Sequence, residues 1–162
     1  MKVSELLEYC RKQTLTELAF GQTVEYRQKA KGNQHCYFFE IGETKYMVLF
    51  TYKHHTNHPL TEFEFGSNTP SGDPYTVSLT GGGNAIKVFS TVITIMKEYI
   101  AKNQPEVIEF SAKEPSRVKL YNRLLGGFKQ DYEGLGYNLT QKNSDYGADY
   151  FLVNKSIKHG EE

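Results

Sequence analysis

Apolar and polar residues alternate with two different periods along the chain, and each period predicts one kind of element. Alternation at every second residue is typical of strands that bury one face. The predicted strands of this kind are 23–27, 35–41, 44–52, 60–65 and 75–79. Gly42-Glu43 separates the second from the third, a pair typical of a type II′ hairpin turn. Before these strands, residues 3–10 have the apolar spacing of a short helix.

The clearest helix follows the glycine run Gly81 to Gly83. Asn84 is a good N-cap, and the next apolar residues recur at positions i, i+3, i+4 and i+7. These residues are Ala85, Val88, Phe89, Val92, Ile93, Met96, Tyr99 and Ile100. Their stripe is wide, so we expect this helix to pack flat on a sheet. It is predicted to end at Asn103 to Pro105.

A strand at 107–112 comes next, and the connection to it from the strand at 75–79 has the length of a βαβ unit. These two strands are therefore predicted to be parallel neighbours. Ser111 and Glu114 have the spacing of a capping box for a second helix, with Pro115 in its first turn.

The buried stripe of that second helix and its end are also predicted by the pattern. The stripe consists of Val118, Tyr121, Leu124 and Leu125, and the helix is expected to end at Gly126-Gly127. Runs at 136–140 and 149–154 then predict an antiparallel hairpin across a polar loop at 141–147. The fold class that follows is α+β, with a mixed, mostly antiparallel twisted sheet around a central parallel strand–helix–strand unit.

Length and composition favour one domain over the 162 residues. We expect an N-terminal helix and antiparallel strands over 1–74, the glycine-loop half over 75–154, and a frayed tail over 155–162. Nineteen basic residues balance nineteen acidic ones, which gives no support for nucleic-acid binding. No segment has the apolar length of a membrane span or a signal peptide, so the expected location is the cytoplasm. Cys10 and Cys36 are expected to be reduced thiols.

Several residue types suggest chemistry, and each also has a structural explanation. Gly81, Gly82 and Gly83 either form a tight turn or hold an anion with their backbone N–H groups at the helix start. Tyr121 is either a core aromatic residue or a catalytic one. Arg117 is either solvated or bound to a phosphate or a carboxylate.

The histidines of the loop before residue 60 do not predict a metal site. His54, His55 and His58 have no cysteine or carboxylate nearby at ligand spacing. We interpret them as residues of a surface loop, and we expect the chain to bind no metal.

The segment Thr80 to Ala85, with the element order around it, resembles the GCN5-related N-acetyltransferases. In that family the loop after the fourth strand follows Gln/Arg-x-x-Gly-x-Gly/Ala, and its N–H groups bind the pyrophosphate of acetyl-CoA. Gly83 and Ala85 match that pattern, whereas Thr80 stands where Gln or Arg is expected. The resemblance spans about residues 75–154 and implies coenzyme contacts from the loop, including Asn84.

The helix after the next strand extends the resemblance. Ser116, Arg117 and Tyr121 match the place where the family carries a tyrosine that protonates the departing thiolate. Gly127-Phe128 resembles the turn that follows it. The resemblance implies Tyr121 as general acid, with Ser116 and Arg117 near the coenzyme. The strand at 75–79 has no acidic side chain, so Glu62 and Glu64 are the candidate general bases, on the face opposite Phe63 and Phe65.

A second resemblance is to a group of small uncharacterised bacteriophage proteins. It rests on the runs from Gly83 to Val92 and from Phe110 to Tyr121. Two hypotheses follow. The chain is an acyl-CoA-dependent N-acyltransferase for an amine-bearing small molecule or protein, or it is a non-catalytic protein that keeps the scaffold and binds a host or virion protein. The second hypothesis places the chain in the host cytoplasm or in a virion.

Overall fold

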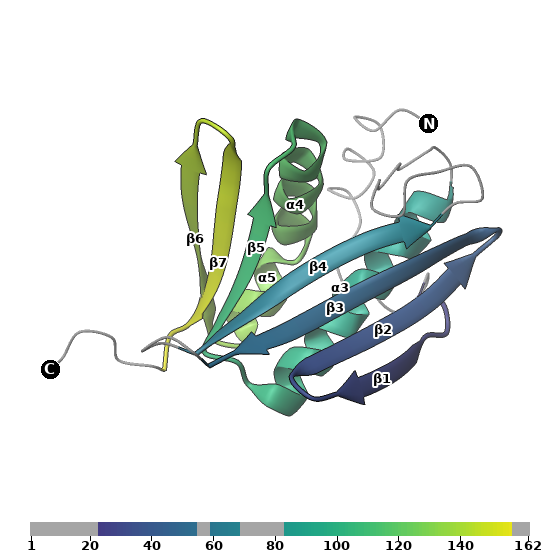
Figure 1. The fold of residues 1–162 in the computed structure, drawn as a ribbon, viewed down its shortest axis with the longest axis horizontal. Helices are drawn as coiled ribbons and strands as arrows, with labels where there is room; N and C mark the ends of the chain where they lie inside the picture. Colours follow the sequence, from purple (N-terminus) through teal and green to yellow (C-terminus); the bar gives the residue numbers. More distant parts are fainter. Residues whose placement is uncertain (1–22, 55–58, 69–82, 157–162) are drawn as a thin grey trace, which may run out of the picture.

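The computed structural model describes residues 23–54, 59–68 and 83–156, and these form one seven-stranded sheet with three helices. The strand order is β1-β2-β3-β4-β5-β7-β6 (Figure 1). The strands are β1 (Arg27–Lys31), β2 (Gln34–Ile41), β3 (Thr44–Lys53), β4 (Leu60–Asn68), β5 (Val107–Ala112), β6 (Tyr137–Ser144) and β7 (Gly147–Asn154). The helices are α3 (Gly83–Asn103), α4 (Pro115–Gly127) and α5 (Lys129–Gly134). The predicted α+β class with a mostly antiparallel sheet is confirmed.

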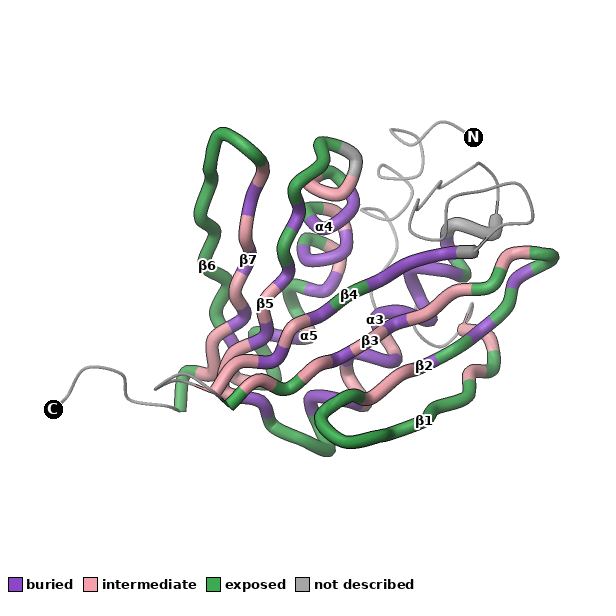
Figure 2. The backbone as a smooth tube through the Cα atoms, in the orientation of Figure 1, coloured by how far each residue is buried: buried purple, intermediate pink, exposed green. Residues whose placement is uncertain are grey.

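All three described helices lie behind the sheet in the view of Figure 1. Strand residues that point toward them are buried, and their neighbours in sequence are more exposed, as β7 shows with Ala148, Tyr150 and Leu152 buried in alternation. Figure 2 shows the same contrast between the buried faces of α3 and the exposed edge strands β1 and β6. The opposite face of the sheet is not covered by any described helix.

Aromatic side chains form much of the core between the sheet and α3. Phe50 of β3 stacks on Tyr99 of α3 with ring centroids 3.8 Å apart, and it meets Phe63 of β4 edge-on at 5.5 Å. Phe63 in turn lies 4.6 Å from Phe110 of β5. Burial of these rings stabilises the packing of α3 on the sheet.

One strand pair, β4 with β5, is parallel, and every other pair in the described sheet is antiparallel. The parallel pairing covers Thr61 to Phe63 against Ile108 to Phe110, although β4 continues to Asn68 and β5 to Ala112. The two strands therefore separate toward their carboxyl ends. Beyond Phe63, the edge of β4 that faces β5 has no strand partner in this pairing.

The predictions for the hairpins, the long helix and β5 are confirmed. A type II′ turn requires a positive φ at its first central residue and a negative φ at its second. Gly42 has φ of +62°, and the φ of Glu43 is not positive. α3 begins at Gly83, so Asn84 lies inside the first turn instead of preceding it. The terminal hairpin forms, but its strands extend to Ser144 and Gly147, so the expected polar loop is a two-residue turn.

Two further expectations were wrong. The first strand covers 27–31 instead of 23–27, because residues 23–26 pack along α3, where the Val24 N–H donates to Thr91 Oγ1 at 3.1 Å. The capping box does not form, because α4 begins at Pro115 and Glu114 occupies the N-cap without a side-chain hydrogen bond. The strand parallel to β5 is β4, and the partner expected for β5, 75–79, lies outside the described residues. A further helix, α5, was not predicted.

Some expectations concern residues outside the described part of the chain. They are the N-terminal helix with Cys10, the strand at 75–79, the loop residues Thr80, Gly81 and Gly82, and His55 and His58. Within the described residues, no helix has the length and apolar character needed to cross a bilayer.

Candidate functional site

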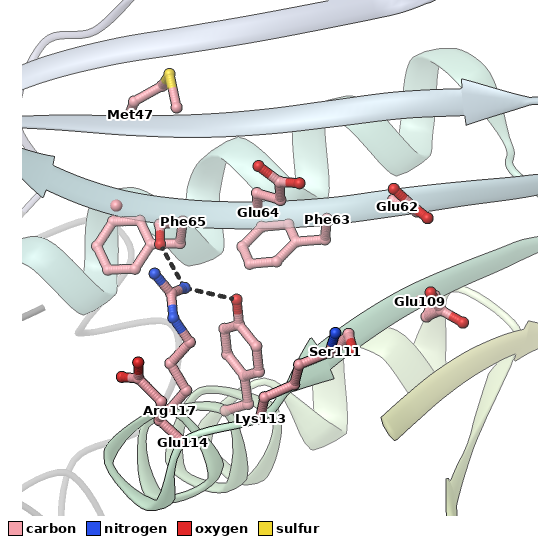
Figure 3. Close-up of a pocket in the computed structure, with 12 residues that line it drawn as sticks. Met47, Glu62, Phe63, Glu64, Phe65, Glu109, Ser111, Lys113, Glu114 and Arg117 are labelled. Carbon is pink, nitrogen blue, oxygen red and sulfur yellow. Dashed lines mark hydrogen bonds between the residues drawn. The ribbon is translucent and has the colours of Figure 1, made fainter. Parts of the chain in front are cut away.

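A cleft with a cavity of about 350 Å³ opens where β4 and β5 separate. Its walls come from β3, β4, β5, the loop that follows β5, and α4, as the close-up in Figure 3 shows. The lining residues are Met47, Glu62, Phe63, Glu64, Phe65, Gly66, Glu109, Ser111, Lys113, Glu114, Arg117 and Tyr121. The cavity therefore brings together Tyr121, Glu62, Glu64 and Arg117, four of the residues that the sequence singled out.

Residues from both faces of the sheet line this cavity. Phe63 and Phe65 are 2% and 3% exposed on the helix side, whereas Glu62 and Glu64 point to the uncovered face. This confirms the prediction that the two carboxylates lie opposite the rings. Because the strands have separated here, side chains from both faces line the same space.

Tyr121 on α4 is 1% exposed, and its ring is held by two phenylalanines. It meets Phe63 edge-on at 6.1 Å and Phe110 at 5.8 Å. Burial raises the pKa of Tyr121 and Glu64 raises it further, whereas Arg117 and a backbone hydrogen bond with Phe65 lower it. The two interpretations of Tyr121 are thus compatible, since its ring belongs to the core and it lines the cleft.

The Arg117 guanidinium crosses the cleft from α4 to β4. Its Nη1 donates to the Phe65 carbonyl oxygen at 3.0 Å and to the Tyr121 hydroxyl oxygen at 3.3 Å, both drawn as dashed lines in Figure 3. Arg117 therefore provides a hydrogen-bond donor to the β4 backbone beyond the point where the pairing with β5 ends. Its assignment to a coenzyme phosphate stays a prediction.

The mouth of the cleft on the uncovered face is acidic. Glu109 of β5 lies opposite Glu62 of β4 in the parallel register and near Asp149 of β7. Burial raises the pKa of Glu109, and the charges of Asp149 and Glu62 raise it further. Glu62 has a partner of its own, because Lys53 Nζ lies 2.5 Å from Glu62 Oε1.

The sequence interpretation missed Glu109, Ser111 and Asp149. The signal was present in β5, where Ile108 and Phe110 alternate with Glu109 and Ser111 and so turn the polar residues to the other face. What the pattern lacked was the register that sets Glu109 beside Glu62. Ser111, which had been assigned to a helix cap, instead donates to Asp149 Oδ1 at 2.8 Å.

The expected coenzyme loop is described only in its last part. Gly83, Asn84 and Ala85 form the start of α3, and the first turn of this helix carries no acidic residue. The backbone N–H groups and the positive end of the helix dipole are therefore not neutralised by a carboxylate within that turn. Ser116 lies in the first turn of α4.

The described residues contain no group of three or more histidine, cysteine or acidic side chains that would hold a metal ion. His54 stacks on Tyr52, and the Tyr52 hydroxyl lies 3.2 Å from its Nδ1. Cys36 is a free, half-buried thiol on β2, and burial raises its pKa, which disfavours the reactive thiolate.

Comparison with known proteins places the chain in a family. A family model, described as a family of unknown function (DUF6934), matches residues 11–154. The chain belongs to this family. The match includes every described strand and helix and all the residues of the cleft, so the cleft lies wholly within the region that defines the family. No curated protein matches the chain.

Proposed function

We propose that the protein is an acyl-CoA-dependent N-acyltransferase with an acetyltransferase-like arrangement of its sheet. The observation that carries the proposal is the position of Tyr121, buried at 1% exposure yet lining a cavity whose other wall holds Glu62 and Glu64. A buried hydroxyl and a set of carboxylates on opposite walls supply the acid and the base that amine acylation requires.

The order of the strands supports the same proposal. A single parallel pair, β4 and β5, lies inside an otherwise antiparallel sheet, with α3 as the connection and the cleft at the point of separation. This order agrees with the sequence resemblance to the GCN5-related N-acetyltransferases. Strand order alone does not fix an activity, which depends on the residues of the cleft.

The residues present fit acetyl-CoA in two respects. The start of α3 offers backbone N–H groups from Gly83 to Ala85 without an acidic side chain in the first turn, which suits a pyrophosphate. The cavity of about 350 Å³ has room for the acyl end of the coenzyme beside Tyr121. The thioester would supply the activated acyl group, and the acidic mouth would attract a protonated amine.

In the proposed reaction a carbon–nitrogen bond forms and the carbon–sulfur bond breaks. Tyr121 gives its hydroxyl proton to the leaving sulfur, and Glu64 or Glu62 accepts, through water, the proton that the amine loses. The acceptor is an amine-bearing small molecule or a protein amine.

Calorimetric titration of the full chain with acetyl-CoA tests the coenzyme step, with Asn84→Asp as the informative variant. An aspartate near a helix start favours the helix but repels a phosphate there, so Asn84→Asp should keep its stability and bind acetyl-CoA several-fold more weakly. Asn138→Asp adds the same charge on the exposed strand β6 and should bind like the natural chain. Absence of binding by the natural chain at millimolar acetyl-CoA would refute the proposal.

A second candidate is a non-catalytic protein that keeps the scaffold and binds a host or virion protein. The observation that favours it is the bridge from Arg117 to Phe65 O, which gives a cleft residue a structural role between α4 and β4. This candidate requires Tyr121→Phe to retain biological activity. The acyltransferase requires Tyr121→Phe to bind acetyl-CoA normally and to release free thiol from it at least about 100-fold more slowly.

A further inference from the structure

The peptide unit of Phe65 lies on the part of β4 that is no longer paired with β5. The last parallel pair is Phe63 with Phe110, two residues before Phe65. The N–H and C=O of one strand residue point to the same side, and here that side meets α4, because the Phe65 carbonyl oxygen accepts from Arg117. The Phe65 backbone also lowers the pKa of the Tyr121 hydroxyl. Side chains of α4 therefore take the place of a strand partner.

Arg117 and Tyr121 reach this peptide together because they are four residues apart on α4 and so share one face of the helix. Arg117 Nη1 lies 3.3 Å from the Tyr121 oxygen and 3.0 Å from the Phe65 oxygen. A guanidinium has donors and no acceptor, so the Tyr121 oxygen must be the acceptor in its contact with Arg117. The hydroxyl proton of Tyr121 is consequently not used in that contact.

We propose that Arg117 is a positioning residue for the acyl transfer suggested above: anchored on the Phe65 carbonyl oxygen, it holds the Tyr121 oxygen from one side, so that the hydroxyl proton is directed into the cleft. This inference rests on the proposed function. When Tyr121 gives its proton to the leaving sulfur, the phenolate that remains keeps Arg117 as its counter-charge, and water restores the proton after the thiol has left.

The charges around Tyr121 agree with this role. Burial and Glu64 raise the pKa of Tyr121, whereas Arg117 is the largest of the influences that lower it. The other ionisable groups that line the cleft are Glu62, Glu109, Lys113 and Glu114. The positive charge of Arg117 therefore offsets part of the cost of forming a phenolate in a buried site.

The test is a titration of Tyr121 by NMR in protein labelled at the tyrosine ring carbon that bears the hydroxyl, with the signal assigned by its loss in Tyr121→Phe. Arg117→Met removes the charge and the donor, and should raise the pKa of Tyr121 by about one unit or more. Lys119→Met, which removes an exposed charge two residues away on the same helix, should leave it unchanged. An unchanged Tyr121 titration in folded Arg117→Met overturns the inference.

Arg117→Lys keeps the positive charge and a hydrogen-bond donor, so Tyr121 should titrate in this variant close to its value in the natural chain. If Arg117→Met does not fold, Arg117→Lys takes its place in the titration. Free-thiol release from acetyl-CoA gives the second measurement. Arg117→Met should slow turnover in the natural chain and have no further effect in Tyr121→Phe. Equal slowing in both backgrounds overturns the positioning role. If the natural chain neither binds nor turns over acetyl-CoA, the proposed function fails. The NMR titration then still shows whether Arg117 lowers the pKa of Tyr121.

Discussion

A Cβ atom on Gly147 would overlap the carbonyl oxygen of Ala112, because the first residue of β7 touches the last residue of β5. Gly147 also has φ of +145°, a conformation that residues with side chains rarely adopt. Ala112 and Ala148, the neighbouring cross-strand pair, are both small and buried. This close approach brings the terminal hairpin against β5 at the end of the strand that borders the cleft.

Gly147→Ala should therefore destabilise the protein by about 2 kcal/mol or more, since the overlap involves backbone and the conformation is itself strained. Urea unfolding of both proteins measures the difference. Gly126→Ala is the matched control, because Gly126 lies in α4, has nothing within 4 Å of an added Cβ, and should be neutral or slightly stabilising. Equal stabilities of the two variants would contradict the described approach of β7 to β5.

The segment that leads into β1 is attached to α3 by side-chain hydroxyls. Thr91, which is fully buried, accepts from the Val24 N–H at 3.1 Å and donates to the Lys87 carbonyl oxygen at 2.7 Å. Thr91→Val keeps the shape and leaves that N–H without its acceptor. The expected cost is about 1–3 kcal/mol, with faster hydrogen exchange at Val24.

Thr94→Val is the control for this prediction. Thr94 lies on the same helix and its hydroxyl meets Thr23 Oγ1 at 3.0 Å, so its loss should not speed exchange at the Val24 amide. If exchange at Val24 rose equally in both variants, the contact between Val24 and Thr91 would not be the one that holds the segment.

Hydrophobic periodicity predicted the elements whose two faces differ. β5, with Ile108 and Phe110 buried between more exposed neighbours, matched its predicted bounds. All five residues of β1 are exposed, so no alternation marks it, and the apolar residues Val24 and Tyr26 just before it gave a false strand. α5 has six residues with only Tyr132 buried, too few for a helical period to be visible.

The cleft was predictable only in part. The position of Tyr121 follows from its place on the helical stripe, and the face of Glu62 and Glu64 follows from strand alternation. The contact of Arg117 with Phe65 joins residues 52 positions apart and depends on where β4 and β5 separate. A register between strands distant in sequence is not set by local pattern, so neither this contact nor the pairing of Glu109 with Glu62 was available beforehand.

Glu109 should make stability fall as pH rises. Its folded-state pKa is raised above the ordinary value of 4.5, so its contribution to stability is fully present below about that pH and is lost as pH rises through the folded pKa. Glu109→Gln carries no charge, so it should be more stable than the natural chain at pH 7 and close to it at pH 4. Urea unfolding at both values measures the gap.

Glu43→Gln serves as control for Glu109→Gln, because Glu43 is an exposed turn residue between β2 and β3. It should change stability little at either pH. A gap between Glu109→Gln and the natural chain that is the same at pH 4 and pH 7 would show that shape, and not charge, causes the difference.

The terminal hairpin is also joined to α4 through the Tyr150 hydroxyl, which lies 3.5 Å from the Val118 carbonyl oxygen and closer to Asn122. Tyr150 Oη donates to Asn122 Oδ1 at 2.8 Å, and Tyr150 is 1% exposed. A double-mutant cycle of Tyr150→Phe with Asn122→Ala should give a coupling energy of about 0.5–1.5 kcal/mol in the free energy of unfolding. Tyr137→Phe with Asn122→Ala should be additive, because the Tyr137 hydroxyl donates to the Pro105 carbonyl oxygen instead.

The two candidate bases of the proposed acyl transfer differ in their surroundings. Glu62 forms an ion pair with Lys53, whereas the charge of Glu64 is the weakest of the influences that raise the pKa of Lys53. After burial, which is the main influence, Glu64 is the only carboxylate that raises the pKa of Tyr121. Glu64 is thus the carboxylate that acts on the Tyr121 hydroxyl across the cleft, whereas Glu62 is the one that forms an ion pair with Lys53.

Glu64→Gln should therefore lower kcat for acyl transfer by about 100-fold or more, with acetyl-CoA binding unchanged, and Glu62→Gln should lower it less. The measurement is free-thiol release with saturating amine, with acetyl-CoA affinity measured separately by calorimetry. Glu62→Gln is the matched control, since it removes one carboxylate from the same strand and the same face. If Glu62→Gln caused the larger loss, the base would be the lysine-paired carboxylate, and Lys53→Met should then alter the pH dependence of turnover as well.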